Sequence, residues 1–338
     1  MASAAASLSL HAPDLLEQVV AAWPSPAARA IARQLARADE AYHDEAPDEE
    51  RAVLALLGID APGGGSPPLA GVTAAYDLGA AAPGVVRADP VYLRADVARV
   101  VLFDAGHVGL AAAEADALIE LLNASFAGDG LVFRRGRAAH RWYLELPQAP
   151  LPGGASPERL AGAVLEPDVA ERRGLGELRR FVTEVQMLLH DCAVNDARAA
   201  AGQPPINGVW LWGAGELPGA VAPPAFAWGA DDLLAACAAH AGVPHDDDPA
   251  ALAHALARPP GAVVARWPRG AAGSLEELLA GVIEPAAAAL AAGRLARLVI
   301  DTAHAELVST RGSRWRVWRN PARWIAGWQT RLAAAQAP

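Results

Sequence analysis

The chain has 338 residues and a formal net charge of −10 at pH 7. Its length predicts two domains, or one large α/β body with an insertion. The acidic balance disfavours a nucleic-acid-binding protein, because such a protein usually carries a basic face. Every basic residue other than His is Arg, so a Walker, kinase-type or Schiff-base lysine is excluded.

The sequence shows neither a targeting segment nor a membrane span. The first fifteen residues lack the basic region and the long apolar region of a signal peptide. No apolar run approaches the roughly 18 residues that a membrane helix needs. We therefore expect a cytoplasmic protein without membrane contact. Cys192 and Cys237 form no CxxC motif, and we expect both to be small buried apolar residues.

The first 84 residues predict helices separated by loops. Apolar residues at helical spacing indicate helix within 14–38, which two prolines interrupt, and again from Arg51. We expect the acidic run 39–50 to be a solvated loop leading into that helix. The Gly- and Pro-rich stretch 61–68 predicts a flexible loop.

From residue 85 the pattern changes to strands. Alternating apolar residues predict an antiparallel hairpin over 85–106. A helix over 111–127 and two strands, 131–136 and 141–147, follow it. With a further helix over 175–190, this block has the character of an α+β domain.

The rest of the chain alternates strands with helices. In chain order we expect strand 207–215, helix 230–242, strand 262–267, helix 274–292, strand 295–303, edge strand 315–319 and helix 321–335. This alternation favours a parallel, Rossmann-like sheet. We therefore predict an α/β core over 1–84 and 206–338, interrupted by an inserted α+β domain over 85–205.

Four central segments carry a resemblance to a known family. They are RADPVYLRAD (87–96), LIELLNASF (118–126), RWYLEL (141–146) and EVQMLLHDCAVNDARAAAGQPPINGVWLWGAGELP (184–218). In order and spacing they resemble the RpfE-type regulatory proteins. A broader resemblance, which includes LALLGIDAP (54–62), is to archaeal-type cofactor-independent phosphoglycerate mutases. That resemblance implies an alkaline-phosphatase-type core with an inserted substrate domain.

The chain departs from the mutases at the positions that catalysis needs. Those enzymes hold two divalent metals with Asp and His side chains and use a Ser or Thr nucleophile. Here the nucleophile segment reads Pro47, Asp48 and Glu49, and a late Asp-His pair is represented only by Asp301 and His304. The resemblance therefore implies a non-catalytic regulatory or ligand-sensing protein without metal, cofactor or catalytic residues. The alternatives are a residual mutase or phosphatase and a protein-interaction module.

The predicted ligand site combines an arginine with amides and tryptophans that the resemblance places near a cleft. Arg198 suits a phosphate or carboxylate, so the expected ligand is a small phosphorylated acid. The same residues also fit turn caps and domain packing. The set consists of Asn195, Arg198, Asn207, Trp210 and Trp212. A second polar cluster, or ordinary cross-strand pairing, is predicted for Asp89, Arg94, Arg141 and Trp142.

The C-terminal segment is the one basic, aromatic-rich stretch. Trp315 and Trp318 alternate with arginines, and both residue types are enriched in binding hot spots. These two tryptophans are the predicted protein-partner contacts. The alternative is Trp–Arg stacking that seals the terminal helix onto the sheet.

Overall fold

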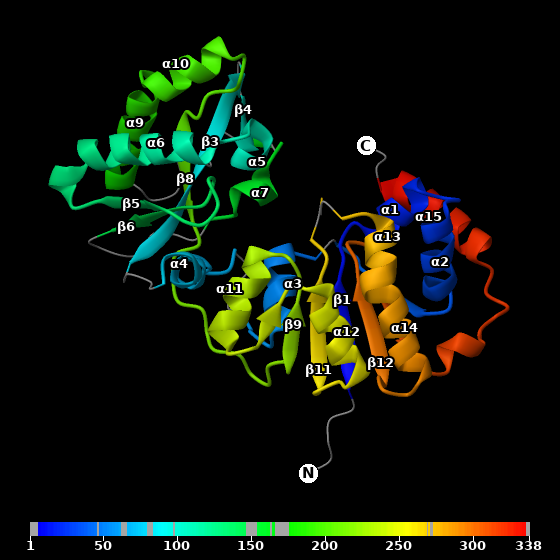
Figure 1. Ribbon diagram of the computed structural model, residues 1–338. Coiled ribbons are helices and arrows are strands. Elements are labelled where there is room, and N and C mark those ends of the chain that lie inside the picture. Colours follow the sequence, from blue (N-terminus) through cyan, green and yellow to red (C-terminus); the bar gives the residue numbers. More distant parts are fainter. Residues whose placement is uncertain are drawn as a thin grey trace. The chain divides into compact units, whose positions relative to one another are not determined.

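The computed structural model describes residues 6–45, 47–61, 66–79, 84–96, 99–146, 154–162, 164–165, 176–268, 270 and 273–335. The chain divides into two compact units (Figure 1). Unit 1 comprises Met1–Asp60 and Gly219–Pro338, and unit 2 comprises Ala61–Pro218. Each unit has its own sheet and its own buried core.

The unit boundaries differ from the predicted 84/85 and 205/206. Strand β8 (Gly208–Trp212) pairs antiparallel with β3 (Val85–Asp96), so it belongs to the sheet of unit 2 and is not a parallel core strand. Helix α4 (Ala70–Leu78) shares a small buried cluster with Val85 and Tyr143 of the same unit. Pairing with distant residues therefore decides where both segments belong.

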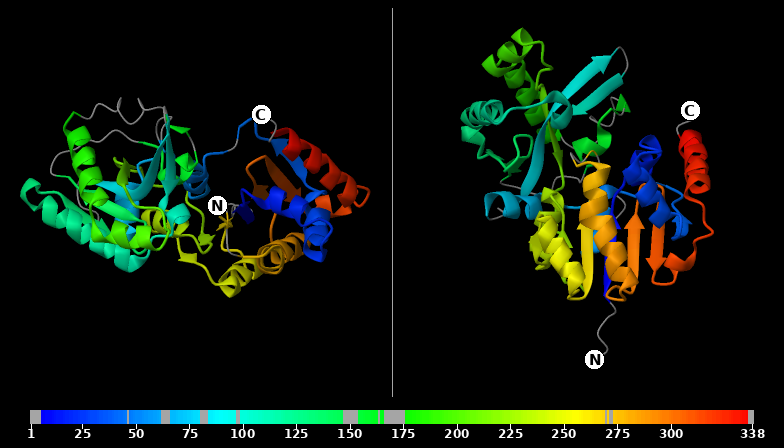
Figure 2. Two further views of the ribbon diagram at one scale, coloured as in Figure 1. Left: turned by 90° about the horizontal axis from the view of Figure 1, so that it is seen from above. Right: turned by 45° about the vertical axis from the view of Figure 1, so that its right-hand side comes forward.

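Unit 1 is built on a seven-stranded sheet in the order β10-β9-β11-β1-β12-β13-β2, with β1 in its middle (Figures 1 and 2). The pairs from β10 to β12 are parallel, whereas β13 and β2 are antiparallel. The α/β prediction for this part is confirmed. The strands are β1 (Ser7–His11), β2 (Asp39–Tyr42), β9 (Phe226–Trp228), β10 (His245–Asp246), β11 (Ala262–Arg266), β12 (Arg297–Asp301) and β13 (Ala305–Thr310).

The sheet edge departs from the sequence prediction in two places. The acidic stretch expected as a loop contains β2, which pairs with β13. The expected edge strand 315–319 is absent from the described residues, because the chain forms a 3-10 turn, η3 (Ser313–Trp315), after β13. In segments as short as these, alternation of apolar residues does not distinguish an edge strand from a turn.

Helices cover the sheet of unit 1 and contribute most of its core. Leu8 and Leu10 of β1 are fully buried against them. Figure 1 shows α12, α13 and α14 lying across one face of the sheet. The helices are α1 (Leu15–Ala21), α2 (Pro26–Leu35), α3 (Glu49–Leu56), α11 (Asp232–Ala241), α12 (Pro249–Ala257), α13 (Leu275–Leu278), α14 (Glu284–Ala291) and α15 (Pro321–Ala335), with the π turn η2 (Leu279–Ile283) between α13 and α14.

Unit 2 has an antiparallel sheet in the order β5-β6-β3-β4-β7, with β8 also on β3. The predicted hairpin is confirmed as β3 and β4. The strands besides β3 and β8 are β4 (Arg99–Asp104), β5 (Val132–Arg135), β6 (Trp142–Glu145) and β7 (Val164–Leu165). The helices besides α4 are α5 (Ala105–Val108), α6 (Ala112–Ser125), α7 (Pro157–Leu160), α9 (Gly176–His190) and α10 (Ala193–Ala200), with the 3-10 turn η1 (Ala127–Asp129).

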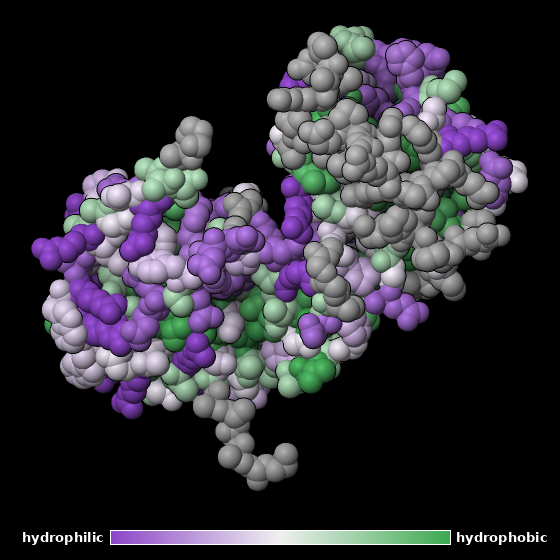
Figure 3. Space-filling view, turned by 180° about the vertical axis from the view of Figure 1, so that it is seen from behind, coloured by the Kyte–Doolittle hydropathy of each residue, from purple (hydrophilic) through white to green (hydrophobic). Residues whose placement is uncertain are grey.

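Figure 3 shows one face of the surface, coloured by hydropathy. Figure 3 shows hydrophilic side chains spread over the visible face of unit 1, with smaller hydrophobic groups between them. Within the part of the chain that the structure describes, no helix has the length and apolar character that a bilayer crossing requires.

Cys192 and Cys237 are both free and buried, as predicted.

Candidate functional site

The carboxyl ends of three neighbouring strands bring polar side chains together in unit 1. Strands β11, β1 and β12 end at Arg266, His11 and Asp301, and the strand register places these residues side by side. We call them the edge row. Open parallel sheets bind their ligands beyond the carboxyl ends of their strands, so this edge is the candidate functional site.

Asp301 is the hydrogen-bonding centre of the edge row. Its Oδ2 lies 2.9 Å from Nδ1 of His11, and its Oδ1 lies 2.8 Å from Nε2 of His43. An ionised carboxylate only accepts hydrogen bonds, so both imidazoles donate. Burial acts to raise the pKa of Asp301, but the hydrogen bonds from His11 and His43 outweigh it and hold that pKa below its ordinary value.

Arg266 neutralises two further carboxylates. Its guanidinium contacts Asp231 and lies 3.2 Å from Oε2 of Glu49. Asp231 also caps α11 by accepting a hydrogen bond from the backbone N–H of Leu234 at 3.0 Å. Arg266 is itself buried, and its Nε has no partner among the described residues. The guanidinium is therefore held by carboxylates on both sides.

Asp48 and His304 serve similar internal roles. Asp48, at the predicted nucleophile segment, caps α3 by accepting hydrogen bonds from the backbone N–H groups of Glu50 and Arg51 at 3.0 and 3.2 Å. His304 lies 2.6 Å from Oε1 of Glu17, so it does not join Asp301 in a shared pair. The Asp-His pairing suggested by the sequence is therefore absent from the described contacts.

The donor set of the edge row does not fit a divalent metal. A search of the described residues finds no group of three or more His, Cys, Asp or Glu side chains arranged to hold a metal ion. Both oxygens of Asp301 accept from imidazoles, and Glu49 and Asp231 face Arg266. Cationic or hydrogen-donating groups of the chain thus occupy the carboxylates that a metal would need.

The predicted ligand residues of unit 2 make internal hydrogen bonds. Asn195 donates to the carbonyl oxygens of Leu189 and Ile206 at 2.6 and 2.8 Å, and accepts from the backbone N–H of Ile206 at 2.9 Å. Asn207 makes a similar two-way bridge to the backbone of Leu93 on β3. The two amides therefore fasten the chain before β8 to its neighbours.

Arg198 is buried, with 1% of its surface exposed. Its guanidinium donates to the carbonyl oxygens of Val108 and Pro204 at 2.6 and 2.8 Å. It also donates to Oε2 of Glu114 at 2.8 Å. These contacts tie α10 to α5 and α6, which supports a structural role over the bidentate ligand contact expected from the sequence.

The two tryptophans of β8 make hydrogen bonds with partners other than those of Arg198. Trp210 donates from Nε1 to the carbonyl oxygen of Ala155 at 2.8 Å, whereas Trp212 donates to Oδ2 of Asp89 at 2.6 Å. Asp89 also accepts from Arg87 at 2.8 to 3.1 Å and from the backbone N–H of Trp142 at 3.1 Å. The second predicted cluster thus contains a buried network, centred on Asp89.

The C-terminal tryptophans divide into two pairs. Trp324 and Trp328 contact each other with ring centroids 6.2 Å apart and pack against the core of unit 1. Trp315 and Trp318 instead expose 65% and 74% of their surfaces. The sealing role expected as the alternative applies to the first pair, and only the second pair is free to meet a partner.

Comparison with known proteins gives structural neighbours but no match to a family model or a curated protein. No protein-family model matches the sequence, and no curated protein matches it significantly. The chain is similar to the cofactor-independent phosphoglycerate mutase from Thermoplasma acidophilum DSM 1728, with a TM-score of 0.43 and 16% identity over 91% of this chain and 90% of that one. It is also similar to the PH0037 protein from Pyrococcus horikoshii, with a TM-score of 0.49 and 14% identity over 92% and 88% of the two chains. We carry no residue role over from either structure.

The sequence did not indicate His11 and Arg266 of the edge row, nor His43, which is bonded to Asp301. His43 lies 258 positions from Asp301, and His11 lies 290 positions from it. Arg266 ends a strand that the sequence predicts. Ligands of parallel sheets bind at the carboxyl ends of the strands, so this position could have marked Arg266 as a site residue. Its carboxylate partners became visible only with the fold.

Proposed function

We propose that this chain is a regulatory protein of the RpfE type that acts by binding and does not catalyse phosphoryl transfer. The proposal includes a scaffold of the phosphoglycerate mutase kind, with an alkaline-phosphatase-type core and an inserted domain. The central sequence segments support the family. The internal pairing of the edge row supports the loss of catalysis, and that is the observation on which the proposal depends.

The physical argument concerns charge. Phosphoryl transfer of the metal-dependent kind needs cations that neutralise the phosphate and activate a nucleophile. In the edge row, Asp301 is bonded to two imidazoles and Arg266 to two carboxylates, so each charge already has its partner within the chain. The helix start that the resemblance assigns to the nucleophile is capped by Asp48, which is a carboxylate and not a hydroxyl. This arrangement repels a phosphate there.

The experiment measures metal content and turnover on the full chain. After dialysis against Mn²⁺ and Zn²⁺ and then against buffer, we expect substoichiometric metal by mass spectrometry. We also expect no interconversion of 3- and 2-phosphoglycerate above the rate without protein. A metal-dependent phosphoglycerate mutase treated in the same way is the positive control. Stoichiometric metal together with turnover would overturn the proposal in favour of a residual metalloenzyme.

A second function, protein-partner binding, is favoured by the exposed apolar residues beside η3. Val317 exposes 70% of its surface between Trp315 and Trp318. Contiguous exposed apolar residues are uncommon on monomers and mark contact surfaces. The segment 311–323 also contains five Arg and no acidic residue, in a chain with a net charge of −10. Charge complementarity therefore points to an acidic protein segment that carries apolar side chains.

The arginines of this segment have separate tasks. Arg316 is paired with Asp39 at 2.6 and 3.0 Å, and Arg319 donates to the carbonyl oxygen of Ala36 at 3.4 Å, so both fasten the segment to the end of α2 and to β2. The side chain of Arg323 makes no hydrogen bond or ion pair with a described residue. It lines a groove of about 580 Å³ together with Trp318. The segment is thus held rigidly while part of its charge stays available.

Peptide selection from a random phage library tests this surface. On the full chain we expect enrichment of peptides rich in Asp and Glu with apolar residues, bound at least about tenfold more weakly by the Trp315→Ala/Trp318→Ala double variant. Met187→Ala, at an exposed apolar residue of unit 2, is the control and should bind as the wild type does. Equal binding by both variants, or binding of single-stranded DNA in place of peptides, would contradict it.

A further inference from the structure

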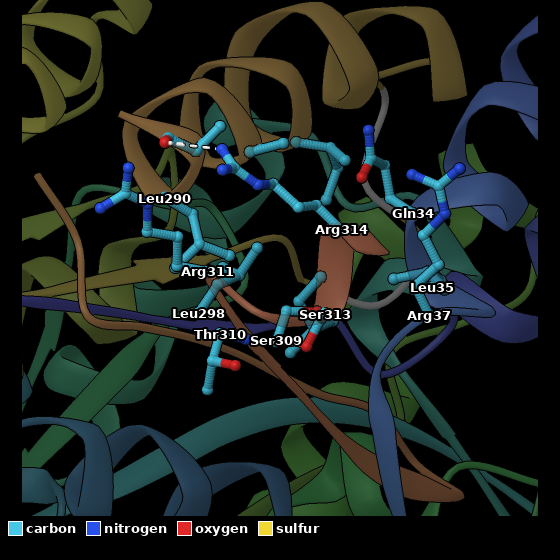
Figure 4. Close-up of a pocket in the computed structure, with 14 residues that line it drawn as sticks. Gln34, Leu35, Arg37, Leu290, Leu298, Ser309, Thr310, Arg311, Ser313 and Arg314 are labelled. Atoms are coloured by element: carbon cyan, nitrogen blue, oxygen red, sulfur yellow. Dashed lines mark hydrogen bonds between the residues drawn. The ribbon is translucent and has the colours of Figure 1, made fainter. Parts of the chain in front are cut away.

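A small hollow in unit 1 brings three arginines together without a carboxylate. It has a volume of about 50 Å³, which accommodates roughly three to five water molecules. Arg37, Arg311 and Arg314 line it, and its lining includes no Asp or Glu. Figure 4 shows Arg311 and Arg314 on one side of the hollow and Arg37 on the opposite side. Its lining includes Thr310, which ends β13 and pairs with Arg297 at the start of β12, so the hollow lies at the edge of the sheet opposite the edge row.

The position of each arginine follows from the element that carries it. Arg37 comes just after α2, while Arg311 and Arg314 follow β13 and flank the start of η3. The guanidinium of Arg314 lies over the ring of Trp315 at 4.6 Å and donates to the carbonyl oxygen of Ala291 at 3.2 Å. The ring of Trp315 and the backbone of Ala291 thus hold the guanidinium of Arg314 in place.

Structural roles account for only part of this positive charge. Arg37 and Arg314 lie near the carboxyl ends of α2 and α14, where a cation is favoured by the helix dipole. Two such helix ends offset roughly one elementary charge between them. The side chains of Arg37 and Arg311 make no hydrogen bond or ion pair with a described residue. The hollow therefore keeps a net positive potential.

The rest of the lining is mostly apolar. Ser309, Thr310, Ser313 and Gln34 add polar groups to it. A lining that combines cations with apolar side chains suits a molecule with an anionic head and a short apolar body. The apolar lining residues are Leu35, Ile283, Ala287, Leu290, Ala291, Leu298 and Ile300.

We infer that this hollow binds a small organic acid, with the carboxylate or phosphate of the acid on the side of Arg311 and Arg314 and its apolar part against Leu298. Guanidinium groups recognise both kinds of head group. The inference deepens the proposed binding function, on which it rests, by assigning the ligand class and a site away from Arg198. It does not depend on whether the edge row holds a metal, so the two proposals can fail separately.

Calorimetric titration of the full chain tests the inference with four defined probes. They are inorganic phosphate, acetate, hexanoate and phenyl phosphate. We expect hexanoate and phenyl phosphate to bind, because only they combine a head group with an apolar body. Acetate and inorganic phosphate should bind at least about tenfold more weakly, since each buried methylene contributes about 0.8 kcal/mol.

Matched variants locate the binding. Arg311→Gln should weaken phenyl phosphate binding about tenfold or more, because it removes a charge-assisted hydrogen bond, whereas Arg37→Gln, on the opposite side of the hollow, should weaken it less. Arg33→Gln, at an exposed arginine one turn earlier on α2, should leave binding unchanged. Circular dichroism confirms that each variant is folded. The inference is overturned if no probe binds, if Arg311→Gln binds phenyl phosphate as tightly as the wild type does, or if acetate binds as tightly as hexanoate.

Discussion

At the scale of single residues, the state of Asp301 couples folding to pH. Its carboxylate accepts from His11 and His43, and these bonds keep its pKa below the ordinary value despite burial. A carboxyl group with a lowered pKa in the folded state stabilises the fold in full above its unfolded-state pKa, which is about 4. That stabilisation is lost as the pH falls through the lower, folded-state pKa.

We therefore predict an acid-sensitive fold that depends on Asp301. The free energy of unfolding, measured by urea titration, should fall between pH 7 and pH 3 in the wild type. It should fall less in Asp301→Asn, which starts lower at pH 7 because the amide cannot accept from both imidazoles. Asp247→Asn, at an exposed loop carboxylate, should keep the wild-type slope. An unchanged slope in Asp301→Asn would contradict the role of this residue.

Single residues also show where sequence reasoning reached its limit. The sequence favours Arg198 as a ligand residue because a guanidinium suits an anion. Its guanidinium instead donates to the carbonyl oxygens of Val108 and Pro204, and the sequence gives no sign that these oxygens lie nearby. The exposure of Trp315 and Trp318 was compatible with the sequence, but so was burial. Residue type predicted the chemistry of each side chain, while tertiary contacts decided which atoms remain available.

At the scale of elements, α4 is fastened to β6 through Asp77. Its carboxylate accepts from Arg141 at 2.5 and 2.7 Å and from the hydroxyl of Tyr143 at 2.7 Å. Burial, together with the bond to Asp77, raises the pKa of Tyr143, so its hydroxyl stays protonated and remains a donor. Asp77 thus anchors α4 both to Arg141, just before β6, and to Tyr143 within β6.

This anchor predicts graded losses of stability. Tyr143→Phe should lower the free energy of unfolding by about 1 kcal/mol, because one hydrogen bond is lost. Asp77→Ala should cost about 3–5 kcal/mol, because it leaves the buried Arg141 without this partner. Tyr76→Phe, one position earlier on α4, should have no effect, as its hydroxyl makes no hydrogen bond with a described residue. Urea titration measures all three, and equal losses in the two Tyr variants would refute the anchor.

Local periodicity accounts for the elements that the sequence predicted well. The hairpin of β3 and β4 and the helix α6 carry strong alternating or helical patterns, and both formed where expected. The capping pair Ser274 and Glu277 also marks a helix start. Strands β2 and β13 were missed, and β8 was assigned to the wrong sheet, because pairing partners far along the chain decide these cases.

At the scale of the whole molecule, two separate cores indicate two cooperative units. Unit 1 buries Ile300 among the strands and helices of its own sheet, and unit 2 buries Arg198 in a network confined to itself. Independent cores favour independent unfolding transitions. The chain crosses between the units near residues 60 and 219. A substitution in one unit should therefore leave the other unit's melting temperature largely unchanged.

Differential scanning calorimetry checks this with one substitution in each unit. Arg198→Ala should lower one transition by roughly 6–12 °C, which corresponds to a loss of about 3 kcal/mol. Ile300→Ala should lower the other by a similar amount, because it opens a cavity in the core. Arg180→Ala, at an exposed arginine of unit 2, should leave both transitions in place. A single transition that moves with either change would show that the units unfold together.

The two buried cysteines have a practical consequence. Cys192 belongs to unit 2 and Cys237 to unit 1, so each unit contains one thiol. Burial raises the pKa of Cys237 to about 12, which leaves almost no thiolate at neutral pH in the native state. Alkylating reagents therefore reach either sulfur mainly when its surroundings open. Mass spectrometry of the alkylated peptides can thus time the opening of each unit without an engineered labelling site.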